Sequence, residues 1–103
     1  MTSSANVFAV PLREARQRAE ITQEDLAAAA GIDEFSASAR ISQYENGKHV
    51  PQYAIARNLA KALRIPVEYL YAADDRTAEL LLLWGRLSVA QKSSLLEQMK
   101  QVF

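Results

Sequence analysis

Two side chains that can recognise bases in duplex DNA lie three residues apart in one short polar segment. Arg40 can form two parallel hydrogen bonds with guanine, and Gln43 can form two with adenine. Ile41 is the large apolar residue of this segment and must face a core, with Ala37 and Tyr44 on the same helical face. A phosphate contact is the alternative role for Arg40, because arginine serves both purposes. The outward positions, which we expect to contact bases in the major groove, are Ser38, Ala39, Arg40 and Gln43.

The charge of the chain is zero overall but unevenly distributed. Residues 20–34 carry five acidic residues and no basic one. Residues 35–64 carry five basic residues against Glu45 alone, a local net charge of +4. A basic face on a neutral protein is typical of a surface that contacts phosphates, although five basic residues on exposed helices would also form an ordinary solvated face.

The elements that must position these side chains are helices, because apolar residues recur at helical spacing and strand patterns do not occur. Thr22, Ser36 and Ser88 are the expected N-caps of three of them, and Ser88 forms a capping box with Gln91. The sequence thus predicts an all-α fold with helices over residues 11–19, 23–30, 36–46 and 52–63, a short fifth helix opened by Pro66, and two more over 74–85 and 89–102.

Six motifs stand out in the first two thirds of the chain, namely TQEDLA at residues 22–27, Gly31-Ile32, ISQYENGK at 41–48, Pro51, LAKAL at 59–63 and Tyr69-Leu70. Together these motifs closely resemble the Xre or Cro/cI-like repressor family. The resemblance covers about residues 12–71 and implies a five-helix helix-turn-helix domain that binds duplex DNA. One departure lies between Gly31 and Ile41, where this chain has nine residues and the common pattern has about five.

In this family the helix expected over residues 36–46 is the recognition helix, which enters the major groove. The resemblance also implies roles for residues outside it. An arginine and a glutamate at the positions of Arg16 and Glu45 form an ion pair in this family. The family position of Gln23 contacts phosphate at a helix N-terminus. His49 is expected to contact phosphate or to be simply exposed. We therefore expect phosphate contacts from Gln23, Asn46, Lys48 and Gln52.

The composition changes near residues 72–75, beyond which the chain is rich in leucine. Residues 80–84 are five large apolar residues in succession, of which one helix face can cover only two or three. We expect a flexible arm at 1–10, a DNA-binding domain at 11–73 and a homodimerisation segment at 74–103. The alternative is that the last two helices fold back on the first domain. The expected interface residues are Leu80, Leu83, Trp84, Leu96, Met99 and Phe103.

Other classes of function are disfavoured by the residues that the chain lacks. It has no cysteine and a single histidine. We therefore expect that the protein is not an enzyme and that it binds neither a metal nor a cofactor. The longest apolar run is five residues, whereas a membrane span needs about 20. Without a pattern typical of a signal peptide, a cytoplasmic location is expected.

The expected function is that of a transcriptional regulator, as a repressor that reads DNA as a homodimer. The family also supplies antitoxins, in which an added segment holds a toxin, and residues 74–103 could serve that purpose. A third alternative is a scaffold whose degenerate helix-turn-helix binds only protein. The intact set of Gln23, Arg40, Gln43 and Lys48 argues against it.

Overall fold

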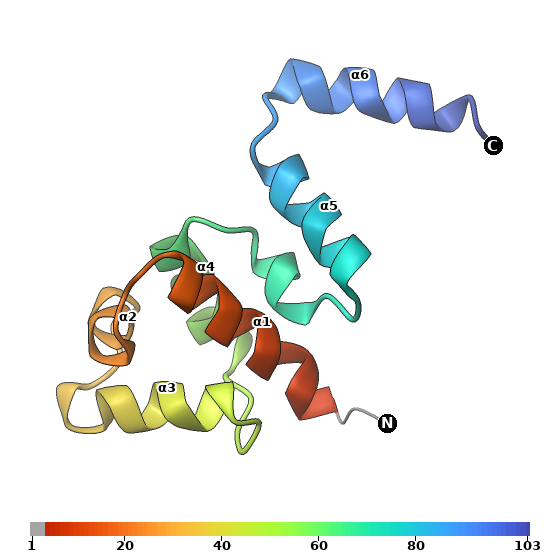
Figure 1. Cartoon of the computed structure of the whole chain (residues 1–103). Coiled ribbons are helices and arrows are strands. Elements are labelled where there is room, and N and C mark those ends of the chain that lie inside the picture. Colours follow the sequence, from red (N-terminus) through yellow and green to blue (C-terminus); the bar gives the residue numbers. More distant parts are fainter. Residues whose placement is uncertain (1–3) are drawn as a thin grey trace.

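The computed structural model describes residues 4–103, which form helices and turns but no strand. This confirms the predicted all-α fold, in which two C-terminal helices follow a helical N-terminal unit (Figure 1). Two 3-10 helices, η1 and η2, accompany six α-helices. The elements are α1 (Ser4–Arg18), α2 (Gln23–Ala29), η1 (Glu34–Ser36), α3 (Ala37–Glu45), α4 (Tyr53–Leu63), η2 (Val67–Tyr71), α5 (Asp75–Gly85) and α6 (Val89–Lys100).

The hydrophobic core lies among the first four α-helices and η2. Each of these five elements contributes one large side chain that is completely excluded from solvent, namely Leu12, Leu26, Ile41, Leu59 and Leu70. Small residues such as Ala27, Ala56 and Ala60 fill the space between them and let the helices approach closely. The core therefore fixes α2 and α3 against α1 and α4.

Local capping signals place three of the helix starts. The Thr22 hydroxyl accepts a hydrogen bond from the backbone N–H of Asp25 at 3.0 Å. Ser88 and Gln91 form the reciprocal capping box at the start of α6, with bonds of 2.9 and 3.1 Å. Asp74 caps α5 by accepting from the N–H of Thr77 at 2.8 Å. The predicted starts of α2, α5 and α6 are thus confirmed.

The longer turn between α2 and α3 forms η1. The Asp33 carboxylate accepts from the N–H of Phe35 at 3.0 Å, and the Asp33 carbonyl accepts from the N–H of Ser36. Ser36 directly precedes α3, but within the described residues its side chain makes no capping bond. Ser36 is thus the N-cap residue of α3, as predicted, but its side chain does not supply the capping bond. Phe35 is left fully exposed at the tip of the turn.

The start of α1 also differs from the expectation. The predicted helix began at Pro11, with a flexible arm before it, whereas α1 begins at Ser4 and holds Pro11 in its interior. A proline there removes one helical hydrogen bond. Phe8 is buried and lies edge-on to Tyr44 and Tyr71, with ring centroids 6.4 and 5.5 Å away. These contacts offset the lost bond and keep the segment helical.

The C-terminal helices extend beyond this core. Ala78 and Leu82 of α5 pack against it, and Gly85 touches Pro66 so closely that a Cβ atom would lie 2.8 Å from the proline Cγ. Within α6, all of which the structure describes, no residue is buried. Figure 1 shows α6 at the end of the molecule opposite α3. The radius of gyration, 15.1 Å, accordingly exceeds the roughly 13 Å typical of a compact 100-residue domain.

Candidate nucleic-acid interface

Helix α3 has one buried face and one outward face. Ala37, Ile41 and Tyr44 are buried, as the spacing predicted. On the other side, Ala39 and Arg40 are exposed, while Ser38 and Gln43 are half-buried.

A shallow depression joins the outward face of α3 to the chain that follows it. Arg40 and Gln43 of α3 line one side of it. His49 of the connector and Gln52, the residue before α4, line the other part. One residue expected to contact phosphate thus lies beside two expected to contact bases. The depression is polar at these positions and is suited to a ligand that offers hydrogen-bond donors and acceptors.

The turn after α3 is held by local hydrogen bonds. The Gln43 carbonyl accepts from the N–H groups of Lys48 and His49 at 3.0 and 3.3 Å. The Asn46 side-chain oxygen accepts from the N–H of Lys48 at 3.0 Å. The charged end of Lys48 and the amide N–H groups of Asn46 remain available at the surface, since both residues are exposed.

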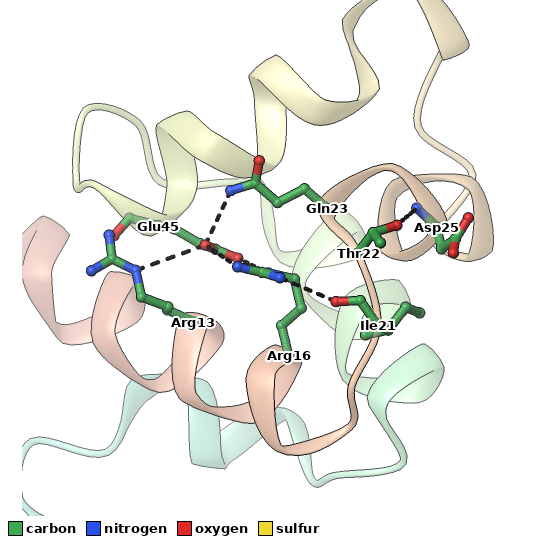
Figure 2. Close-up of polar contacts among 7 residues, drawn as sticks. All are labelled: Arg13, Arg16, Ile21, Thr22, Gln23, Asp25 and Glu45. Carbon is green, nitrogen blue, oxygen red and sulfur yellow. Dashed lines mark hydrogen bonds and ion pairs between the residues drawn. The ribbon is translucent and has the colours of Figure 1, made fainter.

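The carboxylate of Glu45 is the centre of a polar cluster that joins three helices (Figure 2). Arg16 donates to both of its oxygens, from Nε at 2.5 Å and from Nη2 at 3.0 Å. The Gln23 amide donates to the same carboxylate at 3.2 Å, and Arg16 also donates to the carbonyl of Ile21. The hydrogen bond to Glu45 raises the pKa of Arg16 above its usual value.

Two features of this cluster were not anticipated. Arg13 donates to the main-chain carbonyl of Glu45 at 3.0 Å, where α3 ends and its last carbonyls lack helical partners. The signal for it was the spacing of Arg13 and Arg16, which places both on one side of α1. Gln23, which was expected to contact phosphate, also donates its amide to Glu45, and its side-chain oxygen and second N–H stay available to another partner.

Burial of Glu45 changes the charge of the surface around α3. Glu45 is the one acidic residue of residues 35–64, and its side chain is only 3% exposed. Every charged group that this stretch presents to solvent is therefore basic. The exposed charges are those of Arg40, Lys48, Arg57, Lys61 and Arg64.

Two other kinds of site are absent from residues 4–103. No helix in this range is long and apolar enough to cross a membrane. No group of three histidine, cysteine, aspartate or glutamate residues in the described chain could hold a metal ion.

The fold and this surface define a helix-turn-helix protein whose exposed helix suits duplex DNA. A family model described as helix-turn-helix matches residues 12–70. A solved structure described as the transcriptional regulator BswR aligns with a TM-score of 0.82 and 39% sequence identity, over 91% of this chain and 93% of that one. No significant match occurs among curated proteins.

The chain belongs to the Cro/cI-type helix-turn-helix family, as its motifs predicted. Together the two matches support a DNA-binding transcription regulator as its class.

Proposed function

We propose that this chain is a sequence-specific transcriptional repressor that binds duplex DNA as a homodimer, with α3 in the major groove. The observation that carries the proposal is the division of α3 into a buried face and an outward face that presents Arg40 and Gln43. An α-helix fits the major groove, and only there do all four base pairs differ in their pattern of donors and acceptors.

Each expected contact has a role in this arrangement. Ser38, Ala39, Arg40 and Gln43 read bases, with Ala39 small enough to touch a thymine methyl group. Gln23, Asn46, Lys48 and Gln52 hold the phosphate backbone on either side. The Glu45 cluster fixes the N-terminus of α2 to the C-terminus of α3, so that both sets of contacts keep a constant separation.

The homodimer is supported by the apolar surface that α5 and α6 leave uncovered. Leu80 and Leu83 are 50% and 51% exposed, and Leu96, Met99 and Phe103 of the following segment are also exposed. Trp84 is half-buried. An apolar surface of this kind is uncommon on a monomer. A twofold dimer would place two recognition helices about 34 Å apart, one for each half-site.

In this proposal residues 4–73 form the DNA-binding unit and 74–103 the dimerisation segment. The boundary is supported by the exposed Ala73 and by Asp74, the cap at which α5 begins. The unit includes the early part of α1 because Phe8 belongs to the core.

The antitoxin function stays open as a second candidate, because the same apolar surface could hold a different protein. The two functions predict different behaviour of the purified chain. A repressor dimer should form at micromolar concentration without any partner. An antitoxin whose C-terminal helices are reserved for a toxin should sediment as a monomer until the toxin is added.

Selection of bound duplexes from a random library tests the proposal directly. We expect an enriched site with two related half-sites. Its affinity in gel shifts should fall with increasing salt, because phosphates supply much of the binding energy. Failure to bind any duplex at low salt would overturn the proposal. Binding without sequence enrichment would show that α3 makes no base-specific contacts.

A further inference from the structure

A second concave surface lies among α1, the end of α4, the connector at residues 64–66 and α5, and none of the residues that line it belongs to α3. We call it the arginine groove. Its apolar floor includes Leu63, Pro66 and Leu82, and its rim carries Arg18, Arg64 and Arg86. Its volume of about 520 Å³ is within the range of small-molecule sites. The groove therefore joins the DNA-binding unit to the first C-terminal helix.

The charge of the groove is entirely positive. None of the residues described as lining it is acidic. In the part of the chain that the structure describes, no ion pair joins Arg18, Arg64 or Arg86 to a carboxylate. Arg18 lies on Tyr69, with Nη2 3.3 Å from the hydroxyl and the guanidinium carbon 5.9 Å from the ring centroid. That contact orients the guanidinium but leaves its charge unneutralised.

The walls of the groove are held in place by unusual backbone features. Arg64 ends α4 with φ +57° and ψ +44°, the left-handed conformation in which glycine or asparagine is usual. On the opposite wall, Gly85 allows α5 to approach Pro66 closely. Arg86 follows immediately and is thereby brought to the rim.

We propose that the arginine groove binds a small amphipathic anion. The anionic head group would pair with the guanidinium groups of Arg64 and Arg86, whose planar forks match carboxylate and phosphate oxygens. The apolar body would cover Leu63, Pro66 and Leu82. An effector role, in which the ligand biases the position of α5, rests on the proposed function, whereas binding itself does not.

Titration of the isotope-labelled full chain with four eight-carbon compounds tests the proposal by NMR. Octanoate and octyl phosphate share the negative head group, octanol lacks charge and octylamine is positive. We expect the two anions to shift the amide signals of Gly85, Arg86 and Arg64 in a saturable way, and the other two compounds to bind at least about tenfold more weakly. The stronger of the two anions identifies the preferred head group.

Charge-removing variants provide the second arm. Arg64→Gln and Arg86→Gln should each weaken octanoate binding by about three- to tenfold. Arg76→Gln, on the same helix as Gly85 but outside the groove, should leave it unchanged. Equal binding of octanol and octanoate, or shifts confined to α6, would overturn the proposal. Unchanged affinity in both groove variants would overturn it as well, and thermal melts confirm that each variant is folded.

Discussion

Arg16 and Glu45 meet through two hydrogen bonds, although they lie 29 positions apart in the chain. The guanidinium is planar, so paired bonds to both carboxylate oxygens fix the angle between the side chains as well as their distance. Glu45 is the last residue of α3 and Arg16 lies in the last turn of α1. The pair thus sets the direction in which α3 leaves the core, and with it the direction in which Arg40 and Gln43 point.

Replacing Arg16 by methionine should destabilise the fold by about 3 kcal/mol, because the buried Glu45 carboxylate loses its bidentate partner. Urea unfolding followed by circular dichroism measures the change. The matched control is the double variant Arg16→Met with Glu45→Leu, which removes both charges and should recover most of the loss. If the double variant were less stable than Arg16→Met alone, the pair would not be the source of the effect.

Gln43→Ala and Lys48→Ala should affect DNA binding in different ways. Loss of Gln43 should relax the preference at one position of the site, at a cost of about 1–3 kcal/mol for the preferred base. Loss of Lys48 should weaken binding to all sequences equally. It should also reduce the slope of log affinity against log salt concentration by about 1. Competition gel shifts with single-base variants of the selected site measure both. A changed base preference in the Lys48 variant would show that α3 is oriented differently.

Leu83→Glu should weaken the proposed dimer while leaving the monomer folded. Leu83 is 51% exposed in the single chain, so a glutamate there is solvated, whereas in an apolar interface its charge would be buried. We expect the dissociation constant, measured by sedimentation equilibrium, to rise more than about tenfold. Val10→Glu, at a position of similar exposure on α1, is the control and should dimerise normally. Equal dimerisation of both variants would place the interface elsewhere.

The start of α5 should loosen in acid. The backbone hydrogen bond from Thr77, followed by that from its hydroxyl, lowers the pKa of Asp74 below its ordinary value near 3.8. A carboxylate with a lowered pKa stabilises the folded state above the unfolded pKa, and this contribution disappears as the pH falls through the folded pKa. The Thr77 amide signal should therefore titrate with a midpoint below 3.8. In Asp74→Asn, which caps without titrating, the same signal should not move, and an unchanged midpoint would exclude Asp74 as its source.

Features that depend on neighbours in sequence were predictable. Thr22 and Ser88 cap helices because the groups that they bond lie three residues away. The buried face of α3 followed from helical spacing around Ile41. Such signals give the helices and the outward face of α3 without knowledge of the tertiary structure.

Most features that depend on distant contacts were not predictable from local patterns, and the Arg16–Glu45 pair was expected only because of the family resemblance. Residues before Pro11 looked like a frayed end, because proline favours a first helical turn and nothing local shows that Phe8 meets Tyr44 and Tyr71. The placement of Gln23 on Glu45 likewise depends on how α2 meets α3. The arginine groove combines residues from three helices and the connector after α4, so no single segment of sequence shows it.

The missing side chain at position 85 has a consequence for how a dimer would span its operator. Because a Cβ atom there would lie 2.8 Å from Pro66, even alanine must push the end of α5 outward or force the proline ring to shift. In the proposed dimer, α5 connects each DNA-binding unit to the dimer interface at the twofold axis. A displacement of α5 would change the distance between the two DNA-binding units. The number of base pairs that must separate the two half-sites would change with it. The absence of a side chain at this position thereby sets the spacing between the half-sites. Gly85→Ala would prefer operators with a different spacing, although none of the residues proposed to contact DNA has changed.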